Sequence, residues 1–248
     1  MEQHLIEISP LREFLKSRLP PEGFIVNNRA HSIEHSIEAE LPFLQHFNRD
    51  LQITPVMVTI MDETTIHKTS SDLSNLLFEY INVNVFFNHI LVTLISGSKT
   101  NNLTLGEDIF FLISNDADHY GKDFDNDRYG LDLQAHTKGT ENDVRIMGEY
   151  LNGKVSQNEI DLLASEIISN GTNDKQIPIW CGRYPIVLGM NTLYKLVSLM
   201  NKSMQSEPLL YSDSFTEKML PFRNSVMGLT APFSLEHWVG FFSNGFFC

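Results

Sequence analysis

The sequence predicts an α/β fold: a layered sandwich with a central, largely buried sheet and helices on both faces. Short β-branched or apolar runs alternate along the chain with longer stretches that repeat apolar residues at helical spacing. Residues 90–95 and 109–113 are continuous apolar runs, which is typical of central strands buried on both faces of a sheet. No linker rich in proline, glycine or serine divides the chain, so we expect residues 1–248 to form a single domain.

The first half of the chain predicts three helices and a strand before the apolar runs. A helix over residues 9–19 begins at a Ser-Pro pair and ends at two prolines. Residues 33–44 form an apolar stripe at helical spacing, in which Pro42 should cause a kink or an interruption. Residues 53–60 are rich in β-branched side chains and predict a strand. A helix over residues 70–80 would be capped by one of its two leading serines.

The second half predicts two further helices and a return to the sheet. Residues 123–142 are polar and predict a long surface loop. A helix over residues 155–169 has Ser156 as its N-cap and a glutamate at the capping-box position. A second helix covers residues 186–200 after a proline in its first turn. Two aromatic, glycine-rich stretches between residues 225 and 247 should rejoin the sheet.

Charge and cysteine content exclude several classes of protein. The chain has 18 lysines and arginines against 31 aspartates and glutamates, a formal net charge of −13, which disfavours nucleic-acid binding and anionic membrane surfaces. Two cysteines cannot build a disulfide framework. The N-terminus lacks the features of a signal peptide, and no apolar run is long enough to cross a bilayer. We therefore expect a cytoplasmic protein.

One segment carries a pattern known from zinc peptidases. His31, Glu34 and His35 spell H-x-x-E-H, and a helix would place both imidazoles on one face, with the glutamate as general base. Glu107 is a candidate third ligand. The alternative is an amphipathic helix with a solvated glutamate and hydrogen-bonding histidines, because patterns of five residues often arise by chance.

Two later segments also carry side chains suited to chemistry. Asp116 and His119 follow the predicted strand at residues 109–113, where α/β proteins bind ligands, and the carboxylate can orient the imidazole as a base or metal ligand. Cys181 lies just before Arg183 and a predicted helix N-terminus, both of which favour a thiolate. The alternatives are an ordinary turn for the first segment and a small buried hydrophobic residue for the cysteine.

In order, these segments resemble the Memo-like family, also called AmmeMemoRadiSam system protein B. The matching blocks are EHSIE followed by LPFL at residues 34–44, S-x-D-x-x-H-Y-G at residues 114–121 and CGRYPI at residues 181–186. Three blocks in order are far more specific than any one of them. The resemblance extends roughly over residues 10–247.

The resemblance implies a sheet fold related to class III extradiol dioxygenases, which use non-haem iron. It implies that Cys181 is a ligand for iron, copper or zinc. The catalytic residues of the implied pocket are His119, in the place of the dioxygenase base, with Asp116 and His35. A small molecule or a peptide would be the bound partner. The residues expected to contact it are Glu34, Arg183 and Tyr184.

The sequence also departs from the family pattern. The ligand histidines of the family come from HAGY-like and GPSHH-like blocks that precede EHSIE, and this chain begins after them, so we expect an N-terminally short Memo-like domain. Missing strands would expose a sheet edge and favour a homodimer. Tyr184 stands where many members have histidine, and Asp118 is an acidic substitution within the second block.

Three functions follow from these observations, and the sequence leaves open whether the chain is an enzyme. The first is a Memo-like pocket with metal-linked or redox-linked activity. The second is a non-enzymatic binding module that keeps the fold. The resemblance implies phosphorylated peptides as one ligand class, for which Arg183 is the candidate residue, whereas the net charge of −13 argues against such ligands. The third, more remote, is the zinc peptidase.

Overall fold

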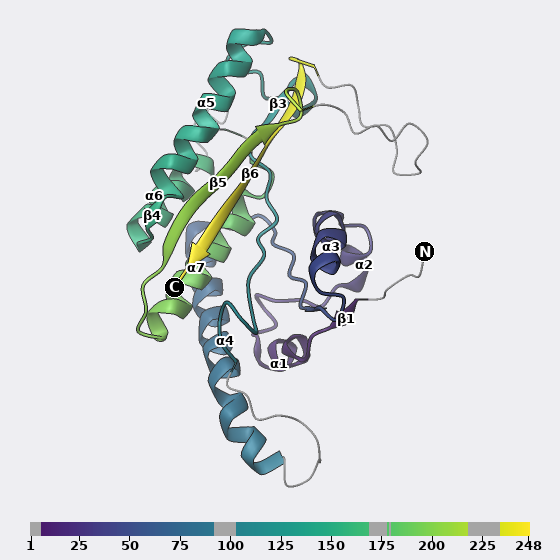
Figure 1. Cartoon of the computed structure of the whole chain (residues 1–248), viewed down its shortest axis with the longest axis vertical. Helices are drawn as coiled ribbons and strands as arrows, with labels where there is room; N and C mark the ends of the chain where they lie inside the picture. The colour runs from purple at the N-terminus through teal and green to yellow at the C-terminus, as the bar shows by residue number, and fades with distance from the viewer. Residues whose placement is uncertain (1–5, 92–102, 169–177, 179, 218–233) are drawn as a thin grey trace. The chain divides into compact units, whose positions relative to one another are not determined.

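The computed structural model describes residues 6–91, 103–168, 178, 180–217 and 234–248 (Figure 1). The chain forms two compact units, of which the first contains residues 1–114 and 188–202 and the second contains residues 115–187 and 203–248. Helices accompany a two-stranded and a four-stranded sheet, so the predicted α/β class is confirmed.

The first unit is built around one long helix. Its core is formed by Leu73, Leu77 and Ile81 of α4 together with Leu196 of α7. Strands β1 and β2 of this unit pair in parallel. The elements of this unit are β1 (Glu7–Ile8), α1 (Pro10–Arg18), α2 (Asn28–His31), α3 (Ser36–Phe47), β2 (Gln52–Ile53), α4 (Glu63–Leu91) and most of α7 (Arg183–Leu199).

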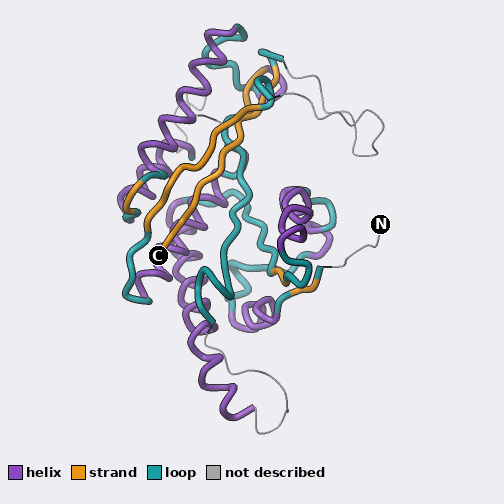
Figure 2. The backbone as a smooth tube through the Cα atoms, viewed as in Figure 1, coloured by secondary structure: helices purple, strands orange, loops and turns teal. Residues whose placement is uncertain are grey.

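The second unit contains an antiparallel sheet in the order β3-β6-β5-β4. The two long strands β5 and β6 run side by side, with helix α5 packed along β5 (Figures 1 and 2). The elements are β3 (His119–Gly121), η1 (Lys122–Phe124), α5 (Leu133–Tyr150), β4 (Gly153–Lys154), α6 (Gln157–Ile167), the first turn of α7, β5 (Gln205–Asp213) and β6 (His237–Phe247).

Elements with strong local signals form as predicted. The Ser9 hydroxyl accepts a hydrogen bond from the Leu11 N–H at the start of α1. At α6, Ser156 and Glu159 form the complete predicted capping box. Helix α7 and strand β6 also form close to their predicted ranges. Pro42 lies inside α3, which continues through it, so the predicted interruption is wrong.

The loop predicted at residues 123–142 holds for residues 125–132 but is wrong from Leu133 onward, where α5 begins. Asp132 caps this helix by accepting a hydrogen bond from the Ala135 N–H. The buried face of α5 includes His136, Gly139 and Asp143, which are not apolar, and therefore apolar periodicity does not reveal it.

The helix predicted over residues 70–80 is longer than expected and is capped elsewhere. Helix α4 covers Glu63–Leu91, and Asp62 accepts a hydrogen bond from the Thr65 N–H before its first turn. Ser70 is therefore a buried residue within the helix and not its cap. The extension of α4 also takes in residues 90–91 of a predicted strand, whose residues 92–95 lie outside the described part of the chain.

The strands predicted at residues 53–60 and 109–113 are also wrong for most of their length. Only the first residue of the former belongs to a strand, β2. Ile109 forms an isolated bridge, and the following four residues have no strand partner among the described residues. Phe110 and Leu112 are exposed, whereas Ile109 and Phe111 pack on the α4 core. Side-chain burial therefore alternates in this run, and one face only is covered.

Within the described residues, no helix combines the length and the apolar character needed to cross a bilayer. The second aromatic stretch, near the C-terminus, forms β6, whereas residues 225–233 lie outside the described part of the chain.

Candidate functional site

Backbone pairing in the second unit brings two distant segments together. His119 begins β3 and pairs with Val239 of β6. The residue before it, Asp118, forms an antiparallel bridge with Trp180, the residue before Cys181. This bridge places the imidazole-bearing and thiol-bearing segments side by side.

Asp116, His119 and Cys181 form a cluster with one ligand atom from each side chain, and these atoms lie within 4.8 Å of one another. The His119 Nε2 atom is 3.3 Å from an Asp116 carboxylate oxygen. The His119 side chain is 21% exposed and that of Asp116 is 41% exposed, whereas Cys181 is exposed. The cluster is therefore open to solvent on the side of the thiol.

The surroundings of His119 favour its protonated form. Burial by itself would lower the pKa of His119, but the hydrogen bonds and charges of Asp116 and Cys181 raise it to about 9. The ring of Phe124 packs edge-on against the imidazole, with centroids 4.9 Å apart. At neutral pH the metal-free cluster therefore contains an imidazolium held next to a carboxylate and a cysteine sulfur.

The turn after Cys181 packs tightly against the segment that contains Asp116. A Cβ atom at Gly182 would lie 2.2 Å from the Asn115 Oδ1 atom, so only glycine fits without moving Asn115. Both polar atoms of the Asn115 amide are buried and have no hydrogen-bond partner among the described residues. An unsatisfied amide beside a cluster of ligand-type side chains is unusual in a purely structural turn.

The structure places Arg183 and Tyr184 in the first turn of α7. The Arg183 guanidinium donates a hydrogen bond to the Trp180 carbonyl oxygen at 3.0 Å, and its Cζ atom lies 5.3 Å from the centroid of the Tyr184 ring. Their predicted contacts with a bound molecule stay predictions.

His35 and Glu34 lie in the first unit, and their predicted part in the pocket also stays a prediction. The helix expected to carry both His31 and His35 is wrong: α2 ends at His31, and His35 is the N-cap of α3. The described residues contain one cluster of three ligand-type side chains, and neither of these histidines is part of it. The zinc-peptidase geometry is therefore not formed.

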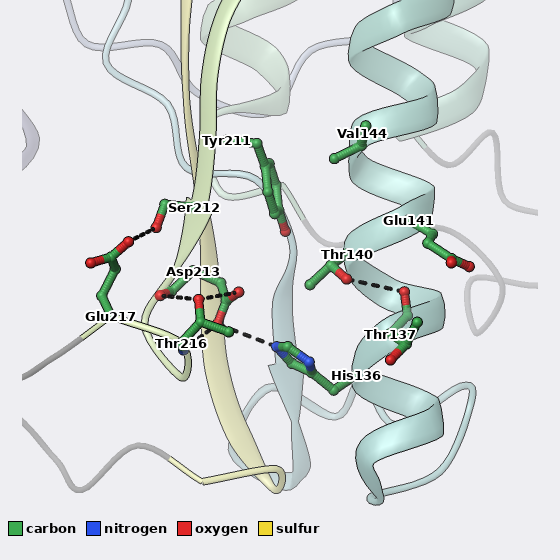
Figure 3. Close-up of a pocket in the computed structure, with 10 residues that line it drawn as sticks. All are labelled: His136, Thr137, Thr140, Glu141, Val144, Tyr211, Ser212, Asp213, Thr216 and Glu217. Carbon is green, nitrogen blue, oxygen red and sulfur yellow. Dashed lines mark hydrogen bonds and ion pairs between the residues drawn. The ribbon is translucent and has the colours of Figure 1, made fainter.

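The second unit also contains a surface cavity that no pattern in the sequence predicts. A surface cavity of about 510 Å³ lies between α5 and the end of β5 (Figure 3). In its wall, the His136 Nε2 atom lies 3.2 Å from an Asp213 carboxylate oxygen, and the Tyr211 hydroxyl donates a hydrogen bond to Asp143 of α5 at 2.9 Å. Helix α5, which forms one wall of this cavity, begins within the segment predicted as a loop. Asp132, a favourable N-cap residue, was the signal in the sequence that could have indicated this helix.

Comparison with known proteins gives matches to part of the chain. Residues 15–93 match a family model described as Memo-like protein. A MEMO1 family protein of Methanosarcina barkeri is 40% identical over 52 residues, which cover 21% of this chain and 20% of that protein. A MEMO1 family protein of Methanosarcina mazei is 44% identical over 50 residues, which cover 20% of this chain and 19% of that protein. The matches span about a fifth of each relative, and the Asp116–His119–Cys181 cluster lies beyond the segment matched by the family model.

Proposed function

We propose that this chain, whose residues 15–93 match a Memo-like family model, binds a transition-metal ion at Asp116, His119 and Cys181 and supports redox-linked chemistry on a small molecule. The observation that carries the proposal is the convergence of a carboxylate, an imidazole and a thiol within 4.8 Å, with the thiol exposed. Three protein donors beside an open position are typical of catalytic metal sites.

The donor set fits such an ion. Thiolate and imidazole ligands favour zinc, copper and iron, whereas magnesium and calcium prefer oxygen ligands alone. Bonds of 2.0–2.3 Å in tetrahedral geometry would place neighbouring donors roughly 3.5 Å apart. The separations of up to 4.8 Å therefore require only a small inward movement of the side chains. The unsatisfied Asn115 amide offers a further polar contact next to the cluster.

The residues of the chain have distinct parts in this proposal. Asp116 holds the His119 ring through its Nε2 atom and keeps it near Cys181. That nitrogen carries the proton shared with the carboxylate, so ion binding must release this proton. Cys181, exposed before α7, defines the side from which a small molecule can approach. A bound ion of this class supplies Lewis-acid or one-electron chemistry.

Titration of the purified protein with Co²⁺ tests the proposal, because sulfur-to-cobalt charge transfer reports a thiolate ligand. We expect one equivalent to bind, with the charge-transfer band lost in Cys181→Ser and the affinity strongly reduced in His119→Ala. Cys248→Ser is the matched control, since this second cysteine is also exposed but lies outside the cluster. Binding that is unchanged in Cys181→Ser would overturn the proposal.

One observation favours a second candidate, thiol chemistry without a metal. His119 interacts with both the Asp116 carboxylate and the Cys181 sulfur, which is the arrangement of a nucleophile, a base and an orienting acid. In this case Cys181 would react with iodoacetamide much faster than Cys248 in protein treated with a chelator, and added Zn²⁺ would not protect it. Protection by one equivalent of Zn²⁺ favours the metal site instead.

A further inference from the structure

We propose that Asp143 of α5 is a positioning residue for the Asp116–His119–Cys181 cluster. Its carboxylate holds together, through hydrogen bonds, the two segments that carry His119 and Cys181. This inference rests on the proposed function of the cluster, because it assigns to a residue outside the cluster the task of holding its geometry.

The hydrogen bonds of the Asp143 carboxylate are the first observation. One oxygen accepts a hydrogen bond from the Trp180 indole N–H at 2.8 Å. The other accepts one from the Asp118 backbone N–H at 3.2 Å and one from the Tyr211 hydroxyl at 2.9 Å. Trp180 and Asp118 directly precede Cys181 and His119 in the chain, so one carboxylate contacts both segments.

The packing around Asp143 leaves this carboxylate little freedom to move. Asp143, Trp180 and Asp118 are all completely buried. Gly240 of β6 pairs with this region, since its N–H donates to the Asp118 carbonyl and its carbonyl accepts from the Ala117 N–H. A Cβ atom at Gly240 would lie 2.8 Å from an Asp143 oxygen, so the strand approaches the carboxylate directly.

The charges around Asp143 indicate that a contribution to stability does not by itself explain why a carboxylate is buried at this position. Its three hydrogen-bond donors are neutral, while the nearby Arg128 forms its ion pair with the Asp118 side chain. Burial, together with the charge of Asp118, raises the pKa of Asp143 to about 7. A buried carboxylate without a cation is costly, and an apolar side chain of similar size is often better tolerated. The carboxylate accepts hydrogen bonds from both segments and so fixes their relative orientation, which an apolar side chain could not do.

Single substitutions can separate this role from general packing. Trp180→Phe removes the donor from the segment that carries Cys181, and Asp143→Asn replaces a carboxylate oxygen by an N–H donor. Tyr211→Phe is one control, because it also removes a hydrogen bond to Asp143 but leaves both site segments attached. Trp238→Phe is a second control, because this equally buried tryptophan loses the same volume and its indole nitrogen has no hydrogen-bond partner among the described residues.

Two readouts report the cluster: the Co²⁺ affinity, and the rate at which iodoacetamide alkylates Cys181 relative to Cys248 in the same molecule. We expect Trp180→Phe to lower the Co²⁺ affinity about tenfold, as loss of residues that orient metal ligands commonly does, and to change the alkylation ratio. Both controls should stay within about twofold of the wild type. Far-ultraviolet circular dichroism and a cooperative urea unfolding transition verify that each variant is folded.

Wild-type values for both readouts in folded Trp180→Phe and Asp143→Asn would overturn the inference. Equal changes in Tyr211→Phe or Trp238→Phe and in Trp180→Phe would also overturn it, because they indicate general loosening. If the wild type binds no Co²⁺ but its alkylation ratio responds to Trp180→Phe alone, the proposed metal function fails while the positioning role of Asp143 stands.

Discussion

Alanine substitutions at two glycines of α5 should have opposite effects on stability. A Cβ atom at Gly139 would lie 2.8 and 2.9 Å from two ring carbons of Trp238, well inside the usual carbon contact distance of roughly 3.5–4.0 Å. Trp238 is completely buried and its ring stacks on Tyr120 with centroids 5.0 Å apart, so it cannot move away freely. At Gly148, on the same helix, nothing lies within 4 Å of the added atom.

The magnitudes follow from two opposing effects. Overpacking of a core costs about 1–3 kcal/mol, whereas replacing glycine by alanine within a helix gains about 1 kcal/mol. We therefore expect Gly139→Ala to lower the free energy of unfolding by up to about 2 kcal/mol, and Gly148→Ala to raise it by about 0.5–1 kcal/mol.

Urea unfolding followed by circular dichroism measures both values, and similar slopes against urea concentration would indicate that the unfolded states are comparable. The reasoning is refuted if Gly139→Ala is as stable as Gly148→Ala, because the indole would then not fill the space beside Gly139.

Three further predictions concern charge and capping. Asp116→Asn should lower the pKa of His119 from about 9, because burial opposes protonation of the imidazole and the substitution removes part of the negative charge that favours it. The NMR shifts of the imidazole protons in metal-free protein measure this pKa. An unchanged pKa would contradict the interaction between Asp116 and His119. Ser156→Ala should cost about 1 kcal/mol in unfolding free energy through loss of the capping box, whereas Ser165→Ala, an exposed position in the same helix, should change it little. The pKa of Asp143 is about 7 in the folded chain, against an ordinary value of 3.8. Its contribution to stability is therefore fully present below pH 3.8 and is lost as the pH rises through 7. Asp143→Asn should reduce this fall in the free energy of unfolding, measured by urea unfolding at a series of pH values.

Signals confined to one turn of the chain predicted the structure well. The capping box of α6 and the Ser-Pro start of α1 depend on residues within four positions of one another, and both form as expected. Helix α5 was missed because its buried face contains Asp143 and His136, whose partners come from distant strands and turns. Polar residues that are buried through remote partners look in the sequence like residues of an exposed loop.

In the candidate site, too, local contacts could be predicted from the sequence and contacts between distant segments could not. Asp116 and His119 lie three residues apart, and their contact follows from local spacing. Cys181 is brought to them by tertiary contacts such as the bridge between Asp118 and Trp180, which the apolar pattern could not indicate. The resemblance of three ordered blocks was the signal that linked these segments, whereas the supporting carboxylate of Asp143 lies in none of the blocks.

The H-x-x-E-H segment shows why a pattern can fail although its residues are correct. Its chemistry requires one helix to continue from His31 to His35, but the Glu34 carboxylate accepts hydrogen bonds from the backbone N–H groups of His35 and Ser36 at 2.7 and 2.8 Å. These bonds, led by that from Ser36, lower the pKa of Glu34, and they satisfy N–H groups at the start of α3. A glutamate whose carboxylate binds the first N–H groups of a new helix cannot lie within a helix that continues through it. The residue that would have been the general base is therefore the one that separates the two histidines.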